Sequence, residues 1–103
     1  MIETVTRKRI EILVDSPLVP KIVELIEAAA ISGWSQTYVD AGGGRDGQWQ
    51  TGELTGAAAK SIVIAIASEA SAERLIDQLA PILDSYRLLL TISDVSVVRG
   101  ERF

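Results

Sequence analysis

Cysteine and histidine are both absent from this chain of 103 residues. Without cysteine there is no disulfide and no thiolate nucleophile, and without histidine the usual proton shuttle and the commonest metal ligand are missing. A Ser-His-Asp or Cys-His catalytic arrangement is therefore excluded. Carboxylates, Lys, Arg, Tyr and backbone amides are the groups left for chemistry, which favours a binding protein over an enzyme.

The chain also lacks an excess of positive charge and a long apolar run. Its 10 Lys and Arg residues and 14 Asp and Glu residues give a net charge of −4. Binders of nucleic acid or of anionic membranes need a basic surface, so neither partner is expected. No apolar stretch approaches the roughly 20 residues that span a membrane, and Met1–Ile10 has no signal-peptide core. These observations predict a cytoplasmic protein without membrane insertion.

Four segments alternate apolar and polar side chains with the period of two that strands show. The segment Lys60–Ala67 is the richest in β-branched residues. In the last segment the apolar residues change face, and a bulge or bend near Asp94 is the expected cause. The predicted strands are 9–14, 34–40, 60–67 and 87–98.

Two further segments carry apolar residues at helical spacing. The first is predicted to run from Pro17 to near Gly33. The second begins at a Ser71 cap and breaks near Ala80, because Pro81 is costly inside a helix. The resulting order, β-α-β-β-α-β, is that of the ferredoxin-like α+β fold, an antiparallel sheet with both helices on one face.

Both faces of this sheet are expected to be apolar, although two helices cover only one. Another copy of the chain is the simplest cover for the second face. One face is expected to hold Ile10, Ile12, Ile62, Ile64 and Ile66, and the other Leu13, Val63, Ala65 and Ala67.

A long connection, 41–59, contains six of the eight glycines. Connections of this length are normally functional or disordered. Gly42, Gly43 and Gly44 follow a predicted strand directly, where their amides can form an anion-binding nest with Arg45 as a further donor. A connection that binds no ligand is the alternative.

With these features the chain resembles the PII signalling superfamily, and more closely the compact PII-like regulators of the SbtB and carboxysome-associated type. The resemblance covers almost the whole chain. It rests on the order of elements, on Tyr38–Gly43 opening the long segment in the place of the family's T-loop, and on the ending Val95–Phe103. It implies one PII-like domain over residues 1–103, with 41–59 as the T-loop.

The resemblance also implies a homotrimer whose sheets pack inward, with an adenine nucleotide in the clefts between subunits. AMP, cyclic AMP, ADP and ATP are all candidates, Mg²⁺ accompanies only ATP, and bicarbonate is a further anion ligand. The T-loop would control a membrane transporter or a protein of carbon or nitrogen metabolism, and Trp49 would anchor that partner or dock on its own trimer. The implied nucleotide-binding residues are Gly42, Gly43, Gly44, Arg45, Arg87, Arg99 and Arg102.

The sequence departs from the nitrogen-regulatory PII proteins at two points. Ser85–Leu88 stands where they have a Gly-Asp-Gly-Lys phosphate loop, and 41–59 contains no tyrosine for uridylylation. Two other classes stay open. One is a CutA-like trimeric metal-binding protein, with Asp40, Asp46 and Glu53 as ligands, and the other is a small enzyme on a ferredoxin-like scaffold that uses Arg, Tyr and Trp.

Overall fold

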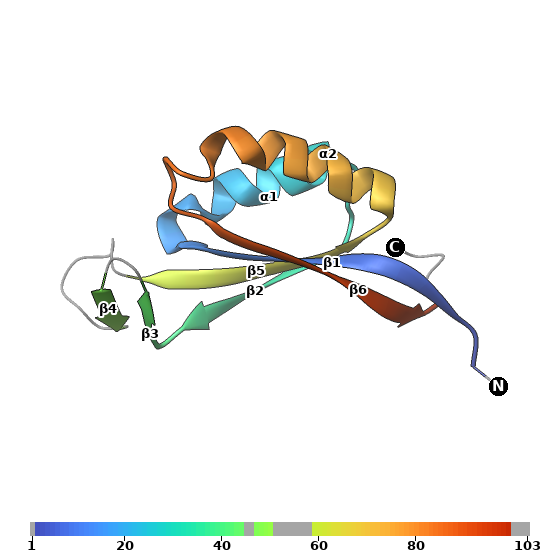
Figure 1. Ribbon diagram of the computed structural model, residues 1–103, viewed down its shortest axis with the longest axis horizontal. Helices are drawn as coiled ribbons and strands as arrows, with labels where there is room; N and C mark the ends of the chain where they lie inside the picture. Colours follow the sequence, from blue (N-terminus) through green and yellow to red (C-terminus); the bar gives the residue numbers. More distant parts are fainter. Residues whose placement is uncertain (1, 45–46, 51–58, 100–103) are drawn as a thin grey trace.

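The computed structural model describes residues 2–44, 47–50 and 59–99. Its main sheet has four antiparallel strands in the order β2-β5-β1-β6, and two helices cover one face of it (Figure 1). This is the ferredoxin-like α+β fold that the sequence predicts. The elements are β1 (Thr4–Asp15), η1 (Ser16–Leu18), α1 (Val19–Ala28), β2 (Trp34–Val39), β3 (Ala41–Gly44), β4 (Gly47–Gln50), β5 (Lys60–Ala67), α2 (Glu69–Leu79), η3 (Ala80–Ile82) and β6 (Leu89–Val98).

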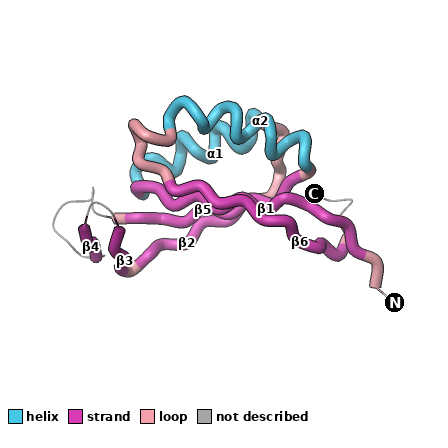
Figure 2. The backbone as a smooth tube through the Cα atoms, in the orientation of Figure 1, coloured by secondary structure: helices cyan, strands magenta, loops and turns pink. Residues whose placement is uncertain are grey.

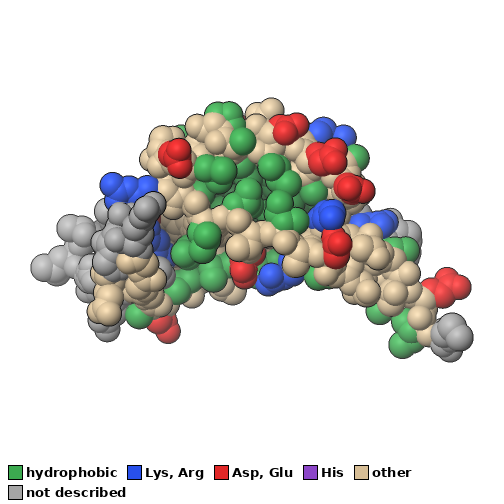
Figure 3. Space-filling model, viewed as in Figure 1, with side chains coloured by type: hydrophobic (Ala, Val, Ile, Leu, Met, Phe, Trp, Pro, Cys, Tyr) green, Lys and Arg blue, Asp and Glu red, His purple; other side chains and the backbone are tan. Residues whose placement is uncertain are grey.

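The core lies between the helices and the sheet, where Figure 3 shows hydrophobic side chains gathered. Every second residue of β1 and β5 points into it, as the period of a strand requires. The alanines of β5 leave room for the helices to approach the sheet. The main core residues are Ile10, Ile12, Val14, Val63, Ala65, Ala67, Ile22, Ile26, Leu75 and Leu79.

The register of β1 and β5 shows which residues share a face. Ile10 lies opposite Ala65, whereas Leu13 lies opposite Ile62. The three isoleucines of β5 therefore lie on the face without helices, and the prediction that placed them with Ile10 is wrong. Alternation fixes the period of a strand, but it does not say which of two apolar faces receives the helices. We call the face without helices the open face; its apolar centre consists of Leu13, Ile62, Ile64, Ile66 and Leu89.

Strand β6 pairs with β1 in one continuous register over Leu89–Val98. The bulge expected near Asp94 is therefore wrong. Figure 2 shows that the outer ends of β1 and β6 extend past the helices. Where β6 extends past the helices, its helix-side face covers no core and needs no apolar side chains. Val95 and Val97 lie on the open face.

The first helix ends in a left-handed residue that is not glycine. Ala30 has φ 63°, its N–H donates to the carbonyl of Glu27 over 3.0 Å, and the N–H of Ile31 donates to the carbonyl of Ile26 over 3.2 Å. These are the two bonds of a Schellman motif. The helix therefore stops before Gly33, because Ala30 takes the position at which a glycine is expected.

The second helix begins one turn earlier than predicted. The Oγ of Ser68 accepts the N–H of Ser71 over 3.2 Å, so Ser68 is the cap. The prediction of Ser71 as the cap is wrong; that residue lies buried in the first turn. After Leu79 the chain turns into η3 around Pro81, which confirms the break predicted near Ala80.

Part of the long connection is regular. Strands β3 and β4 form a separate two-stranded sheet, with Gly43 opposite Gln48. The prediction of a long loop over 41–59 is therefore wrong for Ala41–Gly44 and Gly47–Gln50, which are strands. A glycine-rich segment with few β-branched residues gives little sign of a strand, and here the pairing itself holds the backbone extended.

Candidate functional site

The two ends of the main sheet differ in what they carry. At one end β2 leads into β3, β5 begins, and a turn leads into β6; we call it the loop end, and it holds Val39, Lys60, Asp15 and Leu89. At the other end lie the first residues of β1 and the last of β6; we call it the terminal end, and it holds Thr4 and Val98. The hairpin of β3 and β4 lies beyond the loop end (Figure 1).

The glycines predicted to bind phosphate lie at the loop end. Gly42, Gly43 and Gly44 all belong to β3. A nest needs a left-handed residue beside a right-handed one, but Gly43 and Gly44 have no positive φ. These two glycines therefore form no nest in this conformation, and the phosphate-binding role of Gly42–Gly44 stays a prediction. In a two-stranded ribbon every second amide points away from the partner strand, so β3 still offers outward donors.

Arg87 lies at the same end of the sheet. It is exposed in the turn just before β6, with φ 54°. Its N–H donates to the carbonyl of Asp84 over 3.2 Å, and the N–H of Leu88 donates to the carbonyl of Leu83 over 2.9 Å. This is a second Schellman motif, again with a residue other than glycine in the left-handed position. A left-handed arginine at a candidate site is a strained residue of the kind that gathers at functional sites.

Arg99 lies at the terminal end, directly after β6, with φ 63°. Leu88 and the 10 residues of β6 separate it from Arg87, and the strand alone spans about 33 Å. One chain therefore brings Arg87 and the glycines of β3 to one end and carries Arg99 at the other. Arg45 and Arg102 lie outside the described residues, and Trp49 is described only as part of the β4 backbone.

The sequence analysis did not predict a polar cluster at the loop end, which surrounds the buried Ser61. The Oγ of Ser61 lies 2.7 Å from the Oγ of Ser16 and accepts Nε2 of Gln36 over 3.1 Å. Beside it, Lys60 forms an ion pair with Asp15. The signal in the sequence is a single serine in the apolar run of β5, at a position that faces the helices.

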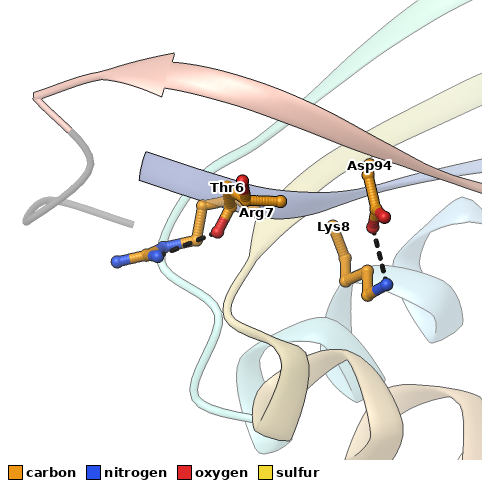
Figure 4. A network of polar contacts seen from close by, with 4 residues as sticks. All are labelled: Thr6, Arg7, Lys8 and Asp94. Carbon is orange, nitrogen blue, oxygen red and sulfur yellow. Dashed lines mark hydrogen bonds and ion pairs between the residues drawn. The ribbon is translucent and has the colours of Figure 1, made fainter. Parts of the chain in front are cut away.

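The terminal end carries charged side chains on β1 and β6. The Nζ of Lys8 lies 2.6 Å from Oδ1 of Asp94, and Nη1 of Arg7 donates to the carbonyl of Thr6 over 3.0 Å (Figure 4). The hydrogen bond and the charge of Asp94 raise the pKa of Lys8. Arg7, Lys8 and Arg9 lie inside β1 and are all half-buried.

The open face has a shallow hollow at its centre. The hollow has a volume of about 100 Å³ and is lined by Leu13, Ile62, Leu89, Glu11 and Thr91. Leu89 keeps 57% of its surface exposed. A large exposed leucine beside other apolar side chains is typical of a surface that another protein covers.

The alternative metal site gains no ligand cluster from the described part of the chain. No three acidic side chains gather there. Asp40 is exposed after β2, while Asp46 and Glu53 lie outside the described residues. Of the helices in the described part, none has the length and apolar composition needed to cross a membrane.

Comparison with known proteins gave matches to families and structures. A family model described as nitrogen regulatory protein P-II matches residues 7–102. The structure of CPII, a nitrogen regulatory PII-like protein from Thiomonas intermedia K12 bound to ADP, AMP and bicarbonate, has a TM-score of 0.91 at 19% identity, over 100% of this chain and 98% of that one. No curated protein matches the sequence.

Two further solved structures show the same fold. A protein of Thermus thermophilus described as PII-like has a TM-score of 0.83 at 23% identity, over 99% of each chain. The GlnK–ATP complex of B. subtilis has a TM-score of 0.62 at 8% identity, over 87% of this chain and 82% of that one.

Proposed function

This chain belongs to the nitrogen regulatory protein P-II family, and from that premise we propose that it is a signalling protein that binds an adenine nucleotide. One observation carries the proposal: the fold matches CPII over its whole length, and the CPII structure holds ADP, AMP and bicarbonate. The loop end supports it, because the amides of β3 and the exposed Arg87 lie at the same end of the sheet.

In this proposal the phosphates lie against the outward amides of Gly42–Gly44. The guanidinium of Arg87 binds a phosphate from the same chain, and Arg45 adds a second side chain to the base of the loop. A planar guanidinium matches the geometry of phosphate oxygens and stays charged at any physiological pH. Bicarbonate, a planar anion, is a second ligand of the same donors.

A homotrimer completes this site. The open face provides the apolar surface for it, since the side chains around Leu13 and Leu89 have no helical cover. We propose that a neighbouring subunit contributes Arg99 and Arg102 to the nucleotide. Within one chain Arg87 and Arg99 lie at opposite ends of the sheet and cannot bind the same nucleotide. With Arg99 from a neighbouring subunit, both can.

The output of the protein, in this proposal, is the segment 41–59 acting as a T-loop. A nucleotide that binds better to one conformation of the segment shifts the population toward that conformation, and the two conformations differ in affinity for a target. Trp49 is the proposed anchor residue, because a large aromatic side chain is the commonest kind of interface hot spot. The proposed target is a membrane transporter or a protein of carbon or nitrogen metabolism, and the proposed regulator is cytoplasmic and not an enzyme.

Isothermal titration calorimetry tests the proposal. The protein is titrated with AMP, cyclic AMP, ADP and ATP, each with and without Mg²⁺ and bicarbonate. We expect micromolar binding of at least one nucleotide, and loss of most of that binding in Arg87→Ala.

The matched control is Arg74→Ala. Arg74 is the arginine of α2, and its Nη2 lies 2.9 Å from the Oγ of Ser71, away from the loop end. This variant should bind as the wild type does. No heat with any of the four nucleotides, from a folded protein of confirmed oligomeric state, would overturn the proposed function.

A further inference from the structure

Ser61 is the most deeply buried polar side chain among the described residues. Its exposed fraction is 0%, and the other buried polar residue there, Ser71, keeps 8%. A hydroxyl has one hydrogen to donate and can accept two bonds. Gln36 donates to the Ser61 oxygen, which leaves Ser61 with its hydrogen to donate and one further bond to accept. The Oγ of Ser16, 2.7 Å away, is the partner in either direction. Leaving such a buried group without partners is costly, so these contacts are strongly held in the folded protein.

The three residues of this cluster come from three different elements. Gln36 belongs to β2, which leads into residues 41–59, and Ser61 belongs to β5, which follows them. Ser16 begins η1, directly after β1, and β1 pairs with the edge of β5 that β2 does not occupy. One hydroxyl therefore joins the strand that enters the long segment to the strand that leaves it.

A second set of contacts holds the same place. The N–H of Ser16 donates to the carbonyl of Ala59 over 3.0 Å, and Asp15 forms an ion pair with Lys60. Asp15, the last residue of β1, thus contacts the first residue of β5, and Ser16, the next residue, contacts the residue before β5. The exit of residues 41–59 is fixed to β1, and Gln36 extends that frame to the entrance.

We propose that Ser61 is a positioning residue of the loop end: its hydroxyl holds the entrance and exit of residues 41–59 in the spacing that nucleotide binding requires. This inference rests on the proposed function. Ser61 contacts no ligand in it and acts through Gln36 and Ser16. Binding groups held by a packed hydrogen-bonded shell keep their geometry, whereas groups without that shell lose affinity.

The test compares Ser61→Ala with Ser71→Ala. Both variants delete one buried hydroxyl, and that of Ser71 accepts Nη2 of Arg74 near the other end of β5. Hydrogen exchange without nucleotide is measured over 34–44 and 59–67, and ADP affinity is measured by calorimetry. Ser61→Ala should speed exchange in both segments and weaken ADP binding about three- to tenfold, the loss that one hydrogen bond produces. Ser71→Ala should change neither. If Ser61→Ala fails to fold, Ser16→Ala takes its place. Ser16 is the half-buried partner of Ser61, so this variant should show the same two effects at a smaller size.

The two readouts separate the two proposals. If the wild type binds ADP but both serine variants bind it equally and exchange alike at the loop end, Ser61 has no positioning role. If the wild type binds none of the four nucleotides, the proposed function fails together with the nucleotide part of this inference, whereas unchanged exchange in Ser61→Ala overturns the positioning role alone. Faster exchange in Ser61→Ala with weaker ADP binding, both absent from Ser71→Ala, supports the inference.

Discussion

Lys8 and Asp94 lie opposite each other on β1 and β6, with Nζ 2.6 Å from Oδ1, on the side of the sheet that faces the helices. The hydrogen bond and the charge of Asp94 raise the pKa of Lys8, with smaller contributions from Glu69 and Glu73. Because the folded-state pKa is the higher one, this pair stabilises the protein fully below the ordinary lysine pKa of 10.5. Its contribution disappears as the pH rises through the folded-state pKa of Lys8.

The corresponding prediction concerns Asp94→Asn. The substitution should lower the pKa of Lys8 toward its ordinary value, as measured by NMR titration of the Nζ group. In denaturation experiments the variant should be less stable than the wild type near neutral pH, and the two should converge above pH 10.5. A difference in stability that stays constant through the lysine titration would contradict the assignment.

Ala30→Gly should stabilise the protein. Ala30 has φ 63° in the left-handed position of a Schellman motif, where glycine avoids the steric cost of a Cβ. After subtracting the larger entropy of glycine in the unfolded chain, we expect a gain of about 0.5–1 kcal/mol in the free energy of unfolding. Urea denaturation measures it. The control is Ala28→Gly, at the last residue of α1, which should lower the stability because its backbone is helical and gains nothing from glycine.

Arg87→Gly should change stability and nucleotide affinity in opposite directions. The residue has φ 54°, so glycine relieves backbone strain and should raise the melting temperature. Loss of the guanidinium should weaken binding of the nucleotide about tenfold or more, as expected for a charge-assisted hydrogen bond. Melting curves and calorimetry on the same preparation test both effects. A stabilised variant with wild-type affinity would remove Arg87 from the proposed site.

Leu89→Glu should break the proposed trimer without unfolding the subunit. Leu89 lines the hollow on the open face and is 57% exposed within one chain, so a glutamate there remains solvated in a monomer and is buried only on assembly. Light scattering after size exclusion should show a smaller species. Ile92→Glu is the matched control, because Ile92 lies on the same strand with 45% exposure but on the opposite face. Equal masses for wild type and Leu89→Glu would argue against the open face as the interface.

The strands were the most predictable part of the fold. Lys60–Ala67 is found as a strand with the predicted bounds, because a run of β-branched residues with strict alternation has few other conformations. Pro81 likewise marks the end of α2. The end of α1 was harder, since Ala30 holds a left-handed position that sequence patterns assign to glycine. The face of the sheet that the helices cover was not predictable either, because both sides of β5 are apolar.

The candidate site was predictable only in its residue types. Glycine content pointed to residues 41–59, and the structure places Gly42–Gly44 and Arg87 at one end of the sheet. That these glycines form a strand was not predictable, because β3 is extended through its pairing with β4 and not through the strand propensity of its own residues. Ser61 was missed because one serine in an apolar run has no distinctive pattern, and its partners Ser16 and Gln36 are far from it in sequence.

The length of β6 has a consequence for how such a sensor would respond to its own abundance. If phosphates need both Arg87 and a neighbour's Arg99, separate subunits have only part of the binding energy, and ligand occupancy and self-association promote each other. Dilution should then lower the apparent ligand affinity, and added ligand should lower the protein concentration at which the assembly dissociates. A cell would obtain a signal only above a threshold amount of this protein, and that threshold would itself fall as the metabolite accumulates.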